Sequence, residues 1–158
     1  MKTIEFVARV WPGCCAAAAL VGLGIWLWKR SRTSALLAAY AFFIFCLAVL
    51  ARSSQPEAQV MLRPFWSYAE WSKEGVQILA NIAAFVPLGY LLGRLYGWKG
   101  VWAGVGFSIL IELLQLISHR GMCEFDDVFH NTLGTVLGVA LEVLLRRRRE
   151  KKHRSGED

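Results

Sequence analysis

The chain has 158 residues, of which 56% are hydrophobic and 13% aromatic, and its formal net charge is +6. A chain this short, with a mean hydropathy of +0.41, excludes two ordinary soluble domains, so residues 1–158 are expected to form a single membrane domain. Basic residues gather in residues 29–32 and 146–154, directly beside apolar runs. This placement is typical of cytoplasmic anchoring and argues against a nucleic-acid-binding face.

Apolar runs predict the fold class, an all-α polytopic membrane helical bundle of about five transmembrane helices. Two runs and the basic turn between them predict an N-terminal helical hairpin over residues 14–51. Residues 52–74 interleave aromatic and charged side chains, which favours an outer interfacial segment, either a plain aromatic belt or a lid over a polar site. The five expected spans cover residues 14–28, 35–51, 76–93, 100–118 and 127–145.

The basic connections predict the orientation. With five spans, residues 29–32, residues 94–99 and the arginine-rich C-terminal tail all fall on one side, which the positive-inside rule assigns to the cytoplasm. The N-terminus is then outside. Residues 146–158 are expected to form a basic cytoplasmic tail that is solvated and partly disordered.

Polar residues recur at one expected depth in the last three spans. Asn81 lies in the third span, Glu112 and Gln115 lie in the fourth, and Asp127 and Asn131 lie in the fifth. Polar and ionisable groups inside a membrane are expensive, and they mark functional sites by default. The sequence therefore predicts a polar pocket at the level of the outer leaflet.

The same three spans carry a Gly-x-x-x-Gly pair in their inner halves, and this spacing lets helix backbones approach closely. The pairs either close the bundle toward the cytoplasm or mediate dimerisation, so an oligomer is possible. Pro87 removes a backbone donor and predicts a kink in the third span. The structural candidates are Pro87, Gly89, Gly134 and Gly138.

Two further features bear on cofactors. The cysteines, Cys14, Cys15, Cys46 and Cys123, have no metal-like spacing, and three of them lie in or beside apolar runs. We therefore predict neither a disulfide nor a zinc site. No glycine-rich phosphate loop is present, and we expect no metal and no cofactor.

Several motifs fall in a fixed order between residues 60 and 140. They are Leu62-x-Pro64-Phe65, Asn81-x-x-x-Phe85-x-Pro87-x-Gly89, Glu112-x-x-Gln115, Arg120, Asp126-Asp127 and Asn131-Thr-Leu-Gly134-x-x-x-Gly138. This pattern resembles the VanZ-like family of small bacterial membrane proteins, so we refer to residues 60–140 as the VanZ-like core. The resemblance implies a bacterial plasma-membrane protein associated with the cell envelope. For the founding member it implies low-level resistance to the glycopeptide teicoplanin, but it implies no settled chemistry.

The first functional hypothesis is an outer pocket that binds an envelope lipid or a lipid-linked cell-wall precursor. Arg120 would hold a phosphate group, because a guanidinium suits bidentate phosphate binding. The amides of Asn81, Gln115 and Asn131, together with Asp126, would fix other polar groups of the ligand. We favour this binding hypothesis over catalysis.

The second hypothesis is a membrane-embedded enzyme acting on a lipid headgroup. Glu112 would be a general base or acid, and Asp127 would pair with it or hold a divalent metal with Asp126 and His130. Dependence of an activity on added divalent metal would favour this alternative.

Each polar residue also has a structural interpretation. Glu112 can be a neutral hydrogen-bonding partner of Asn81 or Asn131. At least one of Asp126 and Asp127 is expected to cap the last helix.

Two charged residues near the ends of spans have equally simple interpretations. Arg120 can contact a lipid phosphate without belonging to a site. Glu142 precedes Arg146 by four residues, and this spacing predicts an ion pair near the cytoplasmic end.

Overall fold

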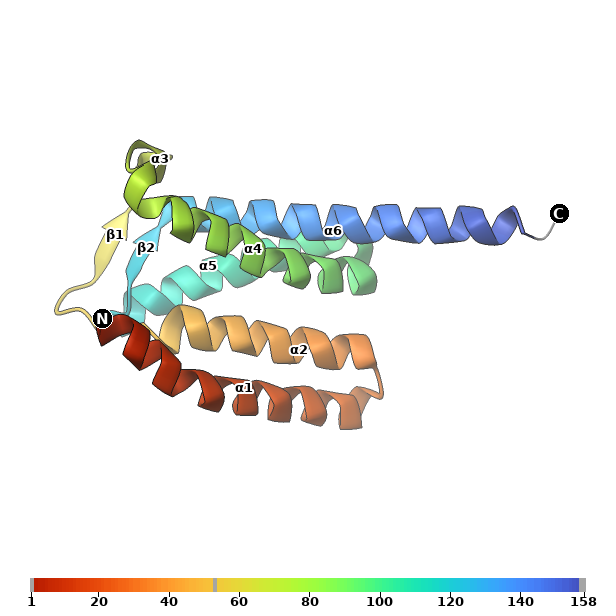
Figure 1. The fold of residues 1–158 in the computed structure, drawn as a ribbon, viewed down its shortest axis with the longest axis horizontal. Helices are drawn as coiled ribbons and strands as arrows, with labels where there is room; N and C mark the ends of the chain where they lie inside the picture. Colours follow the sequence, from red (N-terminus) through yellow and green to blue (C-terminus); the bar gives the residue numbers. More distant parts are fainter. Residues whose placement is uncertain (1, 53, 157–158) are drawn as a thin grey trace.

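The computed structural model describes residues 2–52 and 54–156, and it describes side chains from residue 12 onward. Five long helices dominate the fold, and two short strands and a four-residue helix lie at one end of the bundle (Figure 1). The helices are α1 (Lys2–Lys29), α2 (Arg32–Phe45), α3 (Trp66–Ala69), α4 (Trp71–Tyr96), α5 (Gly100–Ser118) and α6 (Phe125–Arg154), and the strands are β1 (Gln59–Met61) and β2 (Met122–Glu124). The predicted all-α bundle is confirmed.

Four helical stretches of the described chain are long and apolar enough to cross a membrane, namely Pro12–Lys29, Arg32–Leu50, Trp71–Ser118 and Phe125–Arg154. The third stretch contains both α4 and α5, which run in opposite directions around the short turn Gly97–Lys99 (Figure 1). Gly97 has a φ of +58°, a conformation that glycine adopts without strain. The stretch therefore supplies two crossings, and five helices form the bundle.

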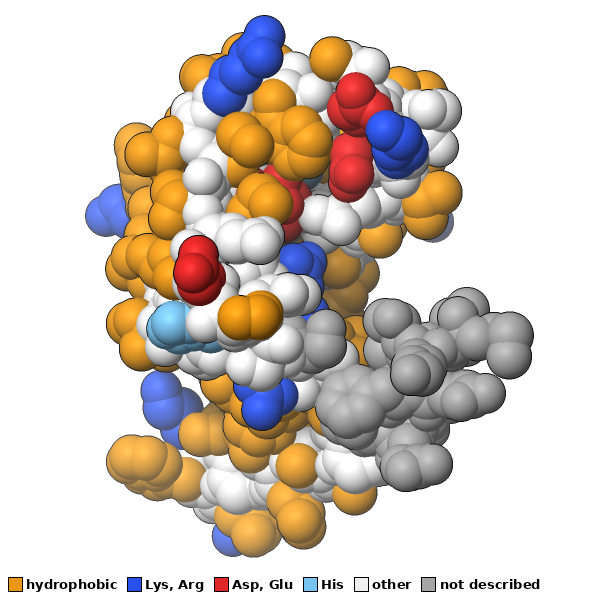
Figure 2. Space-filling model, turned by 90° about the vertical axis from the view of Figure 1, so that its left-hand side faces the viewer, with side chains coloured by type: hydrophobic (Ala, Val, Ile, Leu, Met, Phe, Trp, Pro, Cys, Tyr) orange, Lys and Arg blue, Asp and Glu red, His pale blue; other side chains and the backbone are white. Residues whose placement is uncertain are grey.

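The two ends of the bundle differ in character. The turn between α1 and α2, the turn Gly97–Lys99 and the C-terminal part of α6 lie at one end, which we call the basic end (Figure 1). Both strands and α3 lie at the other, which we call the strand end. Figure 2 shows the strand end face-on, with acidic and basic side chains interspersed among hydrophobic ones. All the strongly basic connections thus share one end.

Helix α6 is longer than the sequence predicts. It stays helical to Arg154, so the prediction of a partly disordered tail is wrong for this part of the chain. Arginine, lysine and glutamate are strong helix formers, and basic residues favour the C-terminal end of a helix dipole. Glu142 lies 4.0 Å from Arg149, and Arg146 lies 3.9 Å from Glu150, so the predicted Glu142–Arg146 pair is also wrong.

The first helix begins earlier in the sequence than predicted. Helix α1 starts at Lys2 and includes Pro12, so residues 2–13 continue the helix of the first span. Helix α2 continues through a π-helical turn, Cys46–Leu50, before the chain leaves the bundle. Helix α4 passes through Pro87 and ends at Tyr96.

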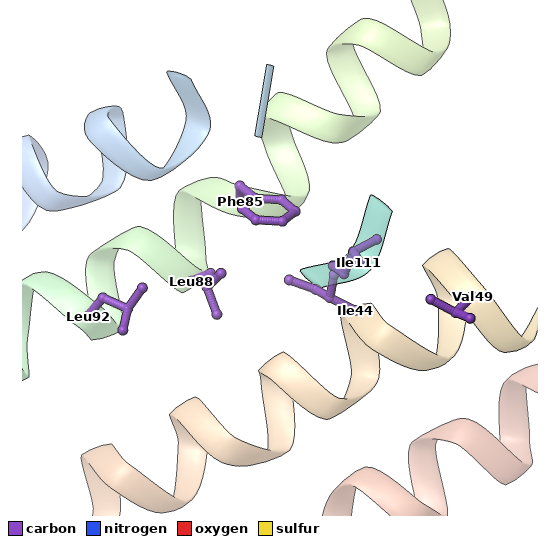
Figure 3. Close-up of a cluster of buried hydrophobic side chains, with 6 residues drawn as sticks. All are labelled: Ile44, Val49, Phe85, Leu88, Leu92 and Ile111. Atoms are coloured by element: carbon purple, nitrogen blue, oxygen red, sulfur yellow. The ribbon is translucent and has the colours of Figure 1, made fainter. Parts of the chain in front are cut away.

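The apolar core joins three of the helices. Six buried side chains from α2, its π-helical turn, α4 and α5 form one cluster (Figure 3), namely Ile44, Val49, Phe85, Leu88, Leu92 and Ile111. Helix α6 packs against α4 in a different way, through close contact between the two helix backbones.

Glycines make that approach possible. A Cβ atom added to Gly138 would meet the backbone oxygen of Val86, and one added to Gly89 would meet the backbone of Thr135. The glycine pairs of α4 and α6 therefore face each other within one chain. In lipid the hydrophobic effect does not drive helices together, so close van der Waals contacts of this kind stabilise the helix pair instead. Packing within the bundle thus accounts for these glycines without a second copy of the chain.

The segments after α2 and after α5 run side by side at the strand end. Strands β1 and β2 are parallel, with Val60 opposite Cys123 and Met61 opposite Glu124. Ser54 also forms a bridge with Arg120. This pairing holds the chain after α2 against the entrance of α6, and it sets the surroundings of the polar site.

Candidate functional site

A cavity of about 230 Å³ lies among α2, α4, α5 and α6. The polar residues that the sequence places at one depth, Asn81, Glu112, Gln115, Asp127 and Asn131, all contribute to its wall. Its other lining residues are Tyr40, Phe43, Ile44, Leu47, Ala48, Arg52, Ala80, Ala84, Phe85 and Ile111. The cavity is thus polar on the α5–α6 side and apolar on the α2 side.

Asp127 has polar partners from two other parts of the chain. The Nδ2 atom of Asn81 donates a hydrogen bond of 2.7 Å to its Oδ1 atom, and Gln77 lies at 3.5 Å from both carboxylate oxygens. The guanidinium of Arg52 lies 3.9 Å from Oδ2. Asp127 is buried, and a buried carboxylate requires such compensation.

Glu112 is buried on α5, and its Oε2 atom accepts a 2.9 Å hydrogen bond from the backbone N–H of Glu124. The predicted pairing of Glu112 with Asn81 or Asn131 is therefore wrong. Strand β2 folds back over the end of α5 and brings a backbone donor to Glu112, while both asparagines bond elsewhere. This bond uses one of the two carboxylate oxygens of Glu112.

Two amide side chains on the wall have a buried oxygen without a partner in the described chain. Gln115 is 1% exposed and donates from Nε2 to the backbone oxygen of Ala48 at 2.9 Å, whereas its Oε1 atom is unpaired. Asn131 is 4% exposed and donates from Nδ2 to Ser108 at 2.9 Å, whereas its Oδ1 atom is unpaired. A carbonyl oxygen accepts hydrogen bonds and cannot donate them, so the bond to Ala48 fixes the orientation of the Gln115 amide. Leaving a buried acceptor unpaired costs about 1–3 kcal/mol.

Asp126 caps a helix, but not the helix in which it lies. Its carboxylate accepts hydrogen bonds from the backbone N–H of Phe65 at 2.6 Å, and from the N–H and hydroxyl of Ser67 at 3.1 and 2.5 Å. The N-cap residue of α6 is Glu124, whose side chain makes no capping bond, so the predicted capping of α6 is wrong. Asp126 instead holds the start of α3, where Phe65 has a φ of +58°.

Arg120 lies outside the cavity wall. Its guanidinium donates to the backbone oxygens of Leu50 and Arg52, at 2.9 and 3.4 Å, and so satisfies carbonyls at the end of the second span. Arg52 is the cation that reaches the cavity, and its side chain is 29% exposed. Sequence reasoning missed Arg52, although its place directly after an apolar run puts it at the same level as the polar residues.

Glu124 is a second residue that sequence reasoning missed. It is buried in β2, outside the membrane-spanning segments, and burial raises the pKa of its carboxyl to about 7. The nearby carboxylate of Asp127 raises this pKa further, and Arg52 lowers it. Glu124 therefore belongs to the charge network of the site through Arg52 and Asp127.

The residues proposed for a metal have other partners. His130 Nε2 lies 3.0 Å from the hydroxyl of Tyr68, and Asp126 is engaged by the start of α3. In the described residues, no group of three or more His, Cys, Asp or Glu side chains is placed to hold a metal ion.

An apolar groove adjoins the cavity. It has a volume of about 390 Å³, and Tyr40 contributes to both spaces. The Tyr40 hydroxyl donates a 3.0 Å hydrogen bond to the backbone oxygen of Ala84, which links α2 to α4 beside both spaces. The groove lies between α2, α4 and α6 and is lined by Leu36, Tyr40, Val86, Pro87, Tyr90, Leu91 and Leu141.

Five apolar helices around a cavity with a partly polar wall define a small polytopic membrane protein. The family model of VanZ/LLP1 matches residues 18–146, which include every residue of the cavity wall. The chain therefore belongs to the VanZ/LLP1 family, and the VanZ-like resemblance of residues 60–140 is confirmed and extended to the N-terminal hairpin. No curated protein and no solved structure matches the chain.

Proposed function

We propose that this protein acts in the cell envelope by binding the headgroup of a membrane lipid or of a lipid-linked cell-wall precursor in the cavity. The observation that carries the proposal is that two residues lining the cavity, Gln115 and Asn131, each keep a buried side-chain oxygen without a partner in the described chain. Buried polar atoms are nearly always hydrogen-bonded, so a wall that leaves two of them unpaired suits a polar ligand.

The adjoining groove supports an amphiphile as the ligand. Tyr40 belongs to the walls of both spaces, so a headgroup in the cavity can continue into a chain in the apolar groove. Arg52 is partly exposed on the cavity wall and can hold a phosphate group, since guanidinium binds phosphate in a charge-assisted and bidentate manner. Arg52 takes the role that the sequence assigned to Arg120.

The proposal includes a sidedness. The strand end faces outward and the basic end faces the cytoplasm, because basic connections are retained on the cytoplasmic side. The cavity then opens at the level of the outer leaflet, where cell-wall precursors are used. Following the founding member of the family, we propose altered teicoplanin susceptibility as the cellular readout.

Cysteine labelling of intact cells tests this orientation. In a background where the four native cysteines are replaced by serine, Glu57→Cys should react with a membrane-impermeant maleimide, and Gly156→Cys should react only after the cells are opened. Both positions are exposed, Glu57 before β1 at the strand end and Gly156 after α6 at the basic end. Labelling of position 156 in intact cells would reverse the orientation and place the cavity at the inner leaflet.

Native mass spectrometry of the purified full-length protein tests the binding function. The wild-type protein should retain a lipid or lipid-linked precursor, and Arg52→Met should weaken retention at least tenfold, because the phosphate loses a charge-assisted partner. Arg63→Met is the matched control, since Arg63 is exposed and lies outside the cavity wall. Equal retention by Arg52→Met and the wild type would contradict the assignment of Arg52.

The enzymatic alternative keeps one specific observation in its favour, which is that Glu112 and Asp127 are both buried carboxylates on the wall of one cavity. Two carboxylates near one headgroup are suited to acid–base chemistry. The same spectra distinguish the two functions. A binding protein returns its lipid with the mass unchanged, whereas an enzyme returns a headgroup product on prolonged incubation.

A further inference from the structure

Polar side chains that line the cavity leave hydrogen-bond acceptors unpaired. Its three amide side chains each direct the NH2 group to an acceptor in the protein. Asn81 donates to Asp127, Gln115 donates to Ala48, and Asn131 donates to Ser108. The amide oxygens of Gln115 and Asn131 remain unpaired, and the carboxylates of Glu112 and Asp127 add further acceptors.

We infer that the bound headgroup is a hydrogen-bond donor, carrying N–H or O–H groups next to its phosphate. This inference rests on the proposed function and names the chemical class of its ligand. An ammonium group and a hydroxyl-rich group share the required chemistry, because both bring donors to the oxygens of Gln115 and Asn131. A trimethylammonium group has the same charge as an ammonium group but has no N–H donor.

The positions of Arg52 and of the two amide side chains define how the headgroup is oriented in the cavity. Arg52 is the partly exposed cation of the wall, whereas Gln115 and Asn131 are buried more deeply. The phosphate therefore lies at Arg52, and the donor group lies beyond it, toward the two amide oxygens.

A matched pair of phospholipids tests the inference. The full-length protein is reconstituted with phosphatidylethanolamine or phosphatidylcholine of identical acyl chains, and lipid retention is measured by native mass spectrometry. Both lipids are zwitterionic and therefore carry the same net charge. They differ only in the N–H donors of the headgroup and in the bulk of its methyl groups. Phosphatidylethanolamine should bind about tenfold more tightly, because phosphatidylcholine leaves the buried oxygens unpaired. Phosphatidylglycerol is the third arm, and its retention would identify hydroxyl groups as effective donors.

A variant separates hydrogen bonding from headgroup size. Gln115→Met keeps the length of the side chain but removes its amide oxygen, so the ratio of phosphatidylethanolamine to phosphatidylcholine retention should fall severalfold. A preference that came from methyl bulk would survive this change. Gln59→Met is the matched control, because Gln59 is exposed on β1. Asn131→Leu provides a second variant of the same kind if Gln115→Met does not accumulate.

Retention of the three lipids distinguishes failure of the donor-headgroup inference from failure of the proposed lipid-binding function. Equal retention of all three lipids, or preference for phosphatidylcholine, would overturn the donor headgroup and leave lipid binding intact. A preference that persists in both variants would overturn it as well. Failure of the wild-type protein to retain any of the three lipids, or any lipid from its own membrane, would overturn the proposed function itself.

Discussion

Gly138→Leu should prevent the protein from accumulating in the membrane. Gly138 lies on α6 against α4, where an added Cβ would meet the backbone oxygen of Val86 and would lie 2.6 Å from the backbone nitrogen of Tyr90. Backbone atoms cannot move aside as a flexible side chain can, so the two helices must separate. Overpacking a tight contact costs about 1–3 kcal/mol and occasionally more, and separation would also disturb the cavity that α4 and α6 share.

The amount of protein in the membrane fraction and its thermal stability in detergent measure this effect. Gly106→Leu is the matched control, because a Cβ at Gly106 meets nothing within 4 Å. Gly22→Leu should have a smaller effect than Gly138→Leu, because its closest neighbour is the Cβ of Ala39 at 2.9 Å, on the N-terminal hairpin. Normal accumulation of Gly138→Leu would show that α4 and α6 do not depend on this contact.

Glu112→Gln should weaken headgroup binding strongly while leaving the fold intact. Glutamine has nearly the same volume as glutamate, and its amide oxygen can still accept the 2.9 Å hydrogen bond from the backbone of Glu124. The substitution removes the ionisable group from the cavity wall and replaces an acceptor by an NH2 donor. Because the ligand is expected to bring donors, this change should weaken retention at least tenfold.

Lipid retention, teicoplanin susceptibility and the expression level of the Glu112→Gln variant are measured together. Glu112→Leu is the companion change, and it should lower accumulation as well, because the N–H of Glu124 would lose its partner at a cost of about 1–3 kcal/mol. If Glu112 were a structural hydrogen-bonding group alone, Glu112→Gln would behave like the wild type. Full retention and an unchanged phenotype in that variant would remove Glu112 from the site.

The helical bundle and the depth of its polar residues could be predicted from the amino-acid sequence alone. Within a bilayer the backbone must satisfy its own hydrogen bonds, so a long apolar run forms an α-helix. The length of each helix follows from the thickness of the bilayer. Helix geometry then fixes the height of each side chain. For this reason the positions of five polar residues along their helices were enough to predict that they lie at one depth in the membrane. All five line the cavity, namely Asn81, Glu112, Gln115, Asp127 and Asn131.

The tertiary structure decided which partner each polar group has. The parallel pairing of β1 with β2 joins segments about 60 residues apart, and no local pattern in either segment specifies it. That pairing sets the surroundings in which Glu112 meets the backbone of Glu124, Asp126 meets the start of α3, and Arg52 rather than Arg120 reaches the cavity. Periodicity gives the height and the face of a side chain, whereas its hydrogen-bonding partner depends on how distant segments pack.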